Sequence, residues 1–288
     1  MNNGPLVFLA AFFALSASWF GFVLTPQIQI GRQQQETNIV NTAEMYPQLR
    51  PGIAHQGMEV YRANNCAACH SQQVGQTGVV VDLVLTETGT NLTAVDAVLK
   101  KMDAGANVAG LVSGLPKTIL SGATMDAADT LAKAFKKAGA KAETRLVSVG
   151  PDMARGWGLR RTVAADYLYD YPVMLGSLRV GPDLANIALR SPDASVHLNH
   201  LYAPRSVVSG SAMPSYRFLF ETRKISGTPS PDALQLPKEF TPAAGFEIVP
   251  KPEARQLVAY LLSLHSDTPL YEAPMSAPVA PKPIAVAK

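Results

Sequence analysis

Two cysteines and a histidine stand together at a spacing that carries chemistry. Cys66 and Cys69 are the two cysteines of the 288-residue chain, and His70 directly follows the second. The arrangement has three readings: a thiol redox pair, half of a zinc site, or covalent haem attachment through two thioethers with the histidine on the iron. A zinc site needs further ligands, and the candidates His197 and His200 lie far along the chain. The adjacent histidine therefore favours one covalently attached haem c.

A second iron ligand decides what such a haem does. One histidine leaves the opposite side of the iron open, and the group that fills it separates electron transfer from ligand chemistry. We expect Met213 there, because Met213-Pro214 stands in a loop of small residues. His197 and His200 compete for this position, and their other readings are hydrogen bonding or contact with haem propionates. Core packing is the reading kept for methionines on predicted helices, namely Met58, Met102 and Met125.

Two features near residue 180 are expected to support the histidine ligand. The segment 181–184, Gly-Pro-Asp-Leu, resembles the part of c-type cytochromes whose proline carbonyl accepts a hydrogen bond from the iron-ligating histidine. The resemblance assigns this role to Pro182, since such a bond orients the imidazole of His70 and strengthens it as a donor. Arg179 has two readings, a partner of a haem propionate or a solvated surface charge.

An uncharged apolar segment lies at the N-terminus. Residues 5–24 carry no charged side chain and are long enough for a helix to cross about 30 Å of hydrocarbon. The alternative is a cleaved secretory signal, but its apolar part is about 7 to 15 residues long and follows a basic stretch, which residues 1–3 do not provide. We therefore expect a single-pass transmembrane anchor over residues 1–30. Arg32 alone would place the following residues in the cytoplasm by the positive-inside rule.

The remaining chain predicts a mainly α cytochrome c domain on this one transmembrane helix, with an inserted small α+β domain. An apolar stripe at helical spacing predicts a closing helix over residues 252–266, and a shorter one predicts a first helix over residues 55–65. The expected divisions are a polar linker 31–51, a cytochrome c domain 52–78 with 150–268, an inserted domain 79–149 and a disordered Pro/Ala tail 269–288.

The inserted domain has a complete pattern of its own, β-α-α-β-α-β. The expected elements are strand 79–85, helices 91–101 and 108–114, strand 117–120, helix 124–138 and strand 143–149. In this order, and in residues 82–85, 116–117 and 134–140, it resembles the C-terminal domain of the bacterial ribosomal stalk protein. That domain's charged docking residues are largely missing from 93–98, so no translation role is implied. A reused scaffold and a docking module are the two readings.

Net charge excludes some functions. The chain carries a formal charge of +3 and has no run of Lys and Arg typical of nucleic-acid binding, so we expect no nucleic-acid partner. No catalytic nucleophile, acid-base pair or phosphate-binding loop stands out, and we expect a non-catalytic subunit.

Several motifs outside the insertion occur in one order, and together with the single anchor they resemble the mono-haem subunit (subunit II) of cbb3-type cytochrome c oxidases. The motifs are Cys69-His70-Ser71-Gln72, Tyr169-Asp170-Tyr171-Pro172, Gly176 to Ala185, His200-Leu201-Tyr202-Ala203-Pro204-Arg205 and Met213-Pro214. Two positions depart from the family pattern, Leu175 and Leu178, where an aromatic and a basic residue are common. The insertion also separates motifs that normally lie closer together.

The resemblance implies partners, a location and a mechanism. A di-haem cytochrome c subunit would supply electrons, and a large haem-copper subunit would receive them and reduce oxygen. The chain would sit in the bacterial inner membrane with its haem domain in the periplasm, since bacteria attach haem c outside the cytoplasm. The mechanism would be outer-sphere electron transfer. The alternatives are a free-standing membrane-anchored shuttle, a haem sensor or peroxidase with an open iron site, and an interaction protein acting through the insertion.

Overall fold

The computed structural model describes residues 3–32, 37–40, 42–102, 110 and 114–275. The chain forms two compact units. The first contains Met1–Leu49 and Val163–Val173, and the second contains Arg50–Thr162 and Met174–Lys288.

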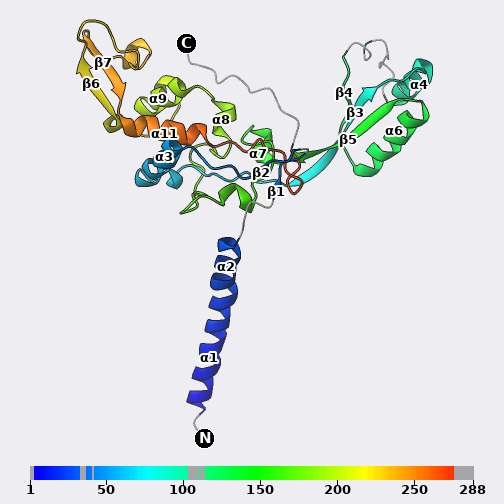
Figure 1. Ribbon diagram of the computed structural model, residues 1–288, viewed down its shortest axis with the longest axis horizontal. Helices are drawn as coiled ribbons and strands as arrows, with labels where there is room; N and C mark the ends of the chain where they lie inside the picture. The colour runs from blue at the N-terminus through cyan, green and yellow to red at the C-terminus, as the bar shows by residue number, and fades with distance from the viewer. Residues whose placement is uncertain (1–2, 33–36, 41, 103–109, 111–113, 276–288) are drawn as a thin grey trace. The chain divides into compact units, whose positions relative to one another are not determined.

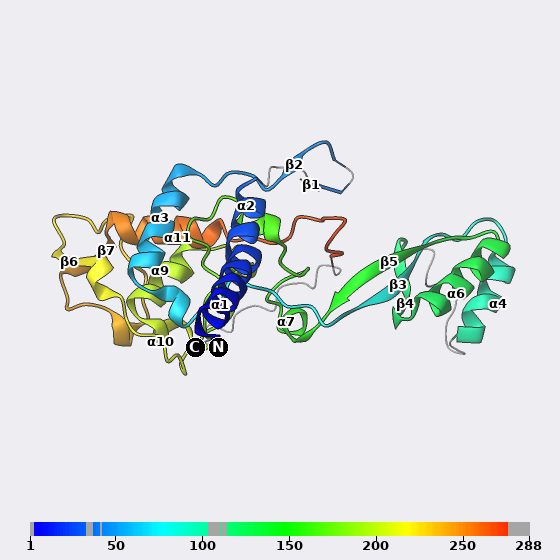
Figure 2. The same ribbon diagram turned by 90° about the horizontal axis from the view of Figure 1, so that it is seen from below.

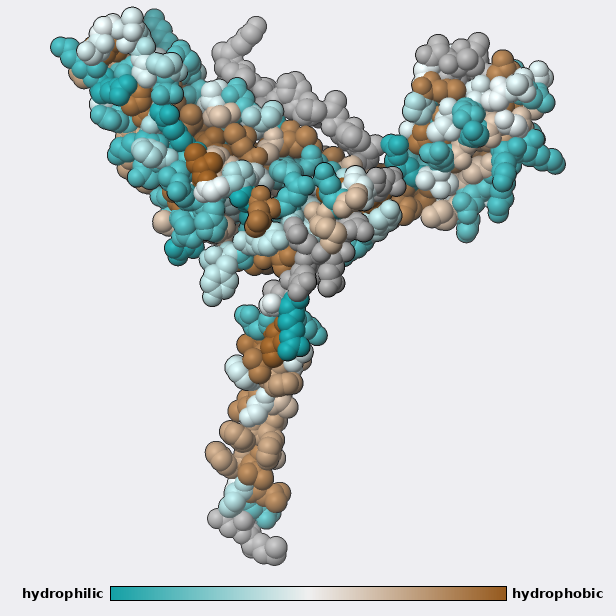
Figure 3. All heavy atoms as spheres, viewed as in Figure 1, coloured by the Kyte–Doolittle hydropathy of each residue, from teal (hydrophilic) through white to brown (hydrophobic). Residues whose placement is uncertain are grey.

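A long apolar helix dominates the first unit (Figure 1). It runs as α1 (Gly4–Trp19), a π-helical turn (Phe20–Leu24) and α2 (Thr25–Gly31). Within Gly4–Gln29 an 18-residue window has a mean hydropathy of 2.1 and none of that window is buried, and Figure 3 shows the apolar colouring along most of the helix. By length and composition this helix can cross a membrane. It is longer than the apolar segment seen in the sequence, because the helix continues through polar residues.

The predicted polar linker is partly ordered. Short strands β1 (Thr37–Asn38) and β2 (Met45–Tyr46) pair antiparallel within it. The Tyr46 hydroxyl donates to Asp166 at 2.6 Å, beside a 3₁₀ turn at Ala164–Tyr167. Polar composition alone could not reveal the bond between Tyr46 and Asp166, since these residues lie far apart in sequence.

Two crossing helices form the centre of the second unit. They are α3 (Gly52–Ala63) and α11 (Pro252–Leu262), which overlap the helices predicted over residues 55–65 and 252–266. They approach so closely that a Cβ at Gly57 would lie 1.8 Å from the carbonyl oxygen of Gln256. Their apolar stripes meet in a core of buried residues: Met58, Tyr61, Met174, Leu184, Leu201, Leu219, Phe220, Ile248, Ala254, Leu257, Val258, Tyr260, Leu261 and Leu264.

Shorter elements surround this helix pair. The helices are α7 (Pro151–Ala154), α8 (Ile187–Arg190), α9 (Ala194–Tyr202) and α10 (Pro204–Val207), with 3₁₀ turns at Cys66–Ala68, Arg217–Leu219 and Lys238–Phe240. Strands β6 (Phe220–Lys224) and β7 (Phe246–Pro250) form an antiparallel hairpin that the sequence analysis did not predict. The long connection between the two strands has no two-residue turn sequence typical of a hairpin, so no local sequence pattern predicted their pairing.

The inserted segment forms a three-stranded antiparallel sheet with two helices on one face (Figures 1 and 2). Its elements are β3 (Gly78–Glu87), α4 (Leu92–Met102), β4 (Lys117–Ala123), α6 (Met125–Lys137) and β5 (Lys141–Val149), and β3 is central. Leu83 and Leu85 of β3 are fully buried against Val95 of α4 and Phe135 of α6. The other five predicted elements occur in the predicted order, while the predicted helix 108–114 lies almost entirely outside the described residues.

The start of the expected disordered tail is packed. Leu270 is 2% exposed and Ala273 is fully buried, and the Pro274 carbonyl accepts a hydrogen bond from Ser148. The structure differs here from the prediction because these few apolar groups find partners far away in sequence. Residues 276–288 lie outside the described part of the chain.

Candidate haem site

A single tight turn presents both thiols and the histidine. Asn65 takes a left-handed conformation with φ of 51° after α3, and the chain then enters the 3₁₀ turn at Cys66–Ala68. The amides of Cys69 and His70 both bond to the carbonyl of Cys66, at 3.1 and 3.0 Å. Both thiols are free, Cys66 half-buried and Cys69 exposed. Burial raises the pKa of the Cys66 thiol to about 11.

The imidazole of His70 is held by a backbone carbonyl. Its Nδ1 lies 2.8 Å from the carbonyl oxygen of Pro182, which can only accept a hydrogen bond. Nδ1 therefore carries the proton and Nε2 keeps its lone pair. Burial lowers the pKa of His70, although the bond to Pro182 opposes this shift. The ring is thus a neutral imidazole whose Nε2 can donate its lone pair to a metal ion, the form in which histidine binds metals.

Two glycines make room for this histidine. A Cβ at Gly181 would lie 2.2 Å from Cε1 of the His70 ring. A Cβ at Gly176 would lie 2.3 Å from the His70 carbonyl oxygen, and Gly176 also has a φ of +82°. The loop containing Pro182 therefore lies against the ring and backbone of His70 more closely than any larger residue would allow.

Met213 packs on the same core as the cysteine turn. It is half-buried against that core, as are Cys66 and Tyr216. Its amide bonds to the Ser211 hydroxyl at 3.2 Å within the loop. Burial raises the pKa of Tyr216, and the neighbouring Cys66 and Cys69 add to the shift. The fold therefore brings the Met213 loop to the cysteine turn across a long stretch of sequence.

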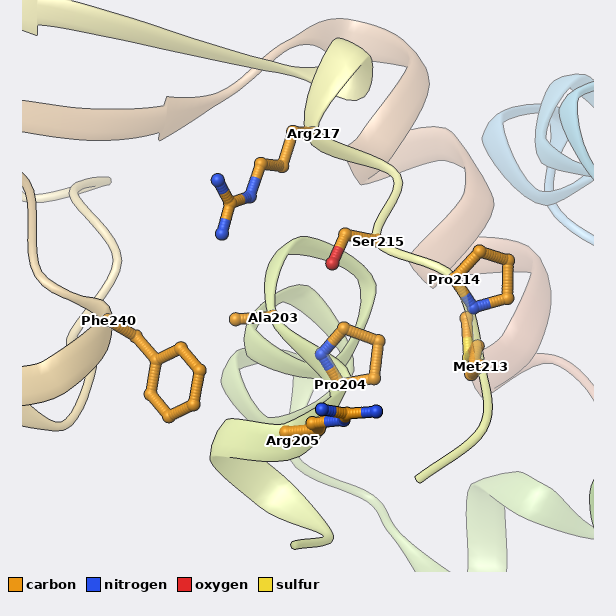
Figure 4. Close-up of a pocket in the computed structure, with 8 residues that line it drawn as sticks. All are labelled: Ala203, Pro204, Arg205, Met213, Pro214, Ser215, Arg217 and Phe240. Carbon is orange, nitrogen blue, oxygen red and sulfur yellow. The ribbon is translucent and has the colours of Figure 1, made fainter. Parts of the chain in front are cut away.

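An open groove of about 340 Å³ borders Met213. Its lining residues are Ala203, Pro204, Arg205, Met213, Pro214, Ser215, Arg217 and Phe240. Figure 4 shows the Arg217 guanidinium, the Ser215 hydroxyl and the Phe240 ring facing this space. Neither Arg205 nor Arg217 forms an ion pair with a described residue, so the groove carries positive charge.

The competing histidines have different surroundings. His197 is buried, and its Nε2 bonds to the Ser191 carbonyl at 2.7 Å, which agrees with the hydrogen-bonding reading. The ring of His200 is half-buried, and burial with the charges of His70 and His197 lowers its pKa to about 4. His200 therefore lies in the electrostatic neighbourhood of His70.

Other methionines are accounted for by packing or exposure. Met58 and Met174 are buried in the main core, Met102 packs in the inserted domain, and Met125 is 47% exposed.

The guanidinium of Arg179 is bound by protein groups. It contacts both carboxylate oxygens of Asp152, at 2.9 and 3.0 Å. Its Nε donates to the Ser71 hydroxyl at 2.9 Å, and Nη2, one of the two nitrogens that contact Asp152, also donates to the Gln73 carbonyl at 2.5 Å. The contact with a haem propionate expected for Arg179 stays a prediction. The observed bonds join Asp152 to Ser71 and Gln73.

A second arginine, Arg190, lies close to His70 and was not predicted from the sequence. Arg190 ends α8 and donates to the Asp183 carbonyl. Its Nε is buried and has no hydrogen-bond partner among the described residues. Burial lowers the pKa of Arg190, and its charge contributes to the lowered pKa of His70. No motif marks this position, since a single arginine after apolar residues is common.

These features fit a haem c. Two free thiols, an available imidazole nitrogen and a thioether lie around one core, and the unpaired Nε of Arg190 could meet a propionate. Among the described residues, no group of three or more His, Cys, Asp and Glu side chains could hold a metal ion instead.

Comparison with known proteins gives one family. A family model described as the mono-haem subunit of cytochrome c oxidase, FixO, matches residues 150–241, which is 92 of the 288 residues. No curated protein matches the chain. The matched residues include Pro182, Arg190 and Met213, while Cys66, Cys69 and His70 precede the match. Over that stretch the chain is similar to a haem-bearing oxidase subunit.

Proposed function

We propose that this protein is a membrane-anchored c-type cytochrome that transfers electrons as the mono-haem subunit of a cbb3-type oxidase. The observation that carries the proposal is the 2.8 Å contact between His70 Nδ1 and the Pro182 carbonyl, which joins the cysteine turn to the segment similar to FixO. The cysteine turn and the segment around Pro182, which are far apart in sequence, meet at Nδ1 of His70. Because Nδ1 carries the proton in this contact, Nε2 keeps its lone pair.

The residues divide the task of holding the group. Cys66 and Cys69 would attach haem c as thioethers, His70 would bind the iron through Nε2, and Met213 would supply a second iron ligand through its sulfur. The chemistry that such a haem supplies is reversible one-electron exchange at its iron. Met213 would keep the iron closed to small molecules, and this favours electron transfer over a sensor or a peroxidase.

Arg190 would meet the anionic edge of the haem. Its Nε is buried, and the carboxylate of the neighbouring Asp183 is already bonded to Ser71, Gln73 and Ala185. A propionate would give the unpaired Nε an acceptor, and a buried donor without a partner costs about 1–3 kcal/mol. In Arg179 the Nε and both terminal nitrogens already have hydrogen-bond acceptors, so we assign the propionate contact first to Arg190.

The apolar helix would place the protein in the inner membrane. Gly4–Gln29 is long enough to span, and we propose that the haem-bearing unit lies in the periplasm, where thioethers form. The partners would be a di-haem cytochrome c subunit and the haem-copper subunit that reduces oxygen. The positive groove beside Met213 is a face on which an anionic electron-transfer partner could dock.

We propose that the inserted domain is a reused scaffold. Its core is complete without help from the rest of the chain, as the buried Leu83, Leu85 and Phe135 indicate. Replacing residues 79–149 by a short Gly-Ser link should leave the haem spectrum unchanged. Lost assembly with an intact spectrum would instead favour the docking reading.

The test is spectroscopic and uses the full chain in detergent. Wild type should contain covalently bound haem, show the weak red band of Met-coordinated ferric iron and resist carbon monoxide when reduced. Met213→Ala should lose the band and bind carbon monoxide, while Met125→Ala, an exposed control, should behave as wild type. Ready binding of carbon monoxide by wild type would favour the sensor or peroxidase. Purification without a haem-copper subunit would favour the free-standing shuttle.

A further inference from the structure

A buried carboxylate ties the base of the inserted domain to the segment that follows His70. Asp152 lies three residues beyond the end of β5 and is 3% exposed. Its Oδ2 accepts the amide of Gly75 at 2.7 Å, and Gly75 lies three residues before β3. One carboxylate thus joins the points where the chain leaves for the insertion and where it returns.

Arg179 extends this contact toward the iron ligand. While its terminal nitrogens hold Asp152, its Nε holds the hydroxyl of Ser71, the residue directly after His70. The same guanidinium bonds the carbonyl of Gln73. The segment 71–75 is therefore bonded to Arg179 at two residues and to Asp152 at a third.

The other side of that segment is bonded to the segment that supplies the Pro182 carbonyl. Ser71 donates to Asp183 at 2.6 Å, the Gln73 amide donates to the same carboxylate oxygen at 2.7 Å, and Asp183 is fully buried. The Leu184 amide returns a bond to the Ser71 carbonyl at 2.8 Å. The separation of His70 Nδ1 and the Pro182 carbonyl is thus set by the register between two hydrogen-bonded segments.

We propose that Arg179 and Asp152 are positioning residues for the His70 ligand. They clamp residues 71–75 between the base of the insertion and residues 179–184, and so hold the imidazole against the Pro182 carbonyl. This rests on the proposed function, and it deepens it by naming groups that set the donor strength of the iron ligand. A hydrogen bond to the second nitrogen raises the basicity of a ligating histidine and stabilises the oxidised metal.

The hairpin β6–β7 offers a matched control. Arg223 pairs with the buried Glu247 at 2.8 Å, as Arg179 pairs with Asp152 at 2.9 Å, and both arginine side chains are partly exposed. Loss of Arg223 removes the cation paired with the buried Glu247, and loss of Arg179 leaves the buried Asp152 with only Arg155, at 3.9 Å, so both changes should lower stability. The two pairs differ in their position. Arg179 is bonded to Ser71, the residue directly after His70, whereas Arg223 and Glu247 lie in the β6–β7 hairpin.

The experiment measures the reduction potential of the purified holoprotein, with the wild-type haem spectrum established first. Arg179→Lys keeps the charge but cannot bond Ser71, Gln73 and Asp152 together, and Arg179→Gln removes the charge. Both should raise the potential, by about tenfold in the redox equilibrium constant for Arg179→Gln, which is about 59 mV for a one-electron couple. Asp152→Asn should also raise it, and Arg223→Gln and Glu247→Gln should leave it unchanged.

The sign of the shift separates positioning from simple charge. If Arg179 acted only as a nearby cation, Arg179→Gln would lower the potential and Arg179→Lys would leave it unchanged, and that pair of results overturns the proposal. Wild-type potentials in both Arg179 variants, with stability lost as in Arg223→Gln, overturn it as well. If Arg179→Gln does not fold, Arg179→Lys decides alone. Absence of covalent haem from wild type would instead refute the proposed function.

Discussion

The Nδ1 atom of His70 lies 2.8 Å from the carbonyl oxygen of Pro182, a residue 112 positions further along the chain. The two residues lie on opposite sides of the inserted segment in the sequence, so the contact closes the candidate site between the two parts of the chain that the insertion separates. It also determines the tautomer of the imidazole, because a carbonyl can only accept.

Gly181→Ala should disrupt this contact. The added methyl group would lie 2.2 Å from Cε1 of His70 and must push the ring away from Pro182. We expect lower haem incorporation and a weakened Met-coordinated ferric band in the absorption spectrum of the purified protein. Gly210→Ala is the control, since nothing lies within 4 Å of a Cβ there. An unchanged spectrum for Gly181→Ala would show that the ring does not pack on this glycine.

Gly57→Ala should destabilise the helix pair. Its Cβ would meet the Gln256 carbonyl oxygen at 1.8 Å, so α3 and α11 must separate. Overpacking of this kind costs about 1–3 kcal/mol, measured as a lower urea midpoint. Gly52→Ala, at the open start of α3, should be neutral or stabilising by up to about 1 kcal/mol. Equal midpoints for the two variants would contradict the close crossing.

Two histidines outside the predicted ligand set should affect stability with opposite pH dependence. Burial lowers the pKa of His197, so its share of stability is present above the ordinary value of about 6.5 and is lost as pH falls. The bond to Asp267 raises the pKa of His265, so its share is present below about 6.5 and is lost as pH rises.

Urea unfolding at about pH 5.5 and 7.5, on either side of the ordinary histidine pKa, tests this. His197→Gln should reduce the loss of stability on acidification. His265→Gln should cost stability mainly at the lower pH, and by less than about 1 kcal/mol because the pair is exposed. The same pH slope in wild type and both variants would rule out these assignments.

The groove beside Met213 should favour anionic electron donors. Arg205→Gln with Arg217→Gln should slow reduction by hexacyanoferrate(II) on the order of tenfold at low salt and leave hexaammineruthenium(II) unaffected or faster. The effect should fade above about 0.1 M salt, where charges are screened within about 10 Å. Lys133→Gln with Lys136→Gln on α6 removes the same charge elsewhere, and an equal slowing there would mean that net charge alone acts.

The sequence by itself determined the parts of the molecule whose signals are local. The Cys66, Cys69 and His70 spacing predicts a covalent haem from neighbouring residues, and the apolar run at the N-terminus marks the candidate membrane helix. Helices α3 and α11 were predicted because their apolar residues recur at helical spacing, and α6 because capping residues, the order of its charges and Gly139 mark its two ends. Residues 117–120 and 143–149 were predicted as strands, and the structure extends them to 117–123 and 141–149 and shows that both flank β3 in one sheet.

Tertiary structure decided what depends on partners distant in sequence. Arg179 looked like a propionate ligand or a surface charge, yet its bonds go to Asp152, Ser71 and Gln73. Arg190 had no signal in the sequence, because only folding buries its Nε and brings its charge close to His70. Leu270 lies in a segment whose composition predicts disorder, yet it is buried. Local composition sets what a segment can form alone, whereas burial and pairing depend on which groups the rest of the chain brings to it.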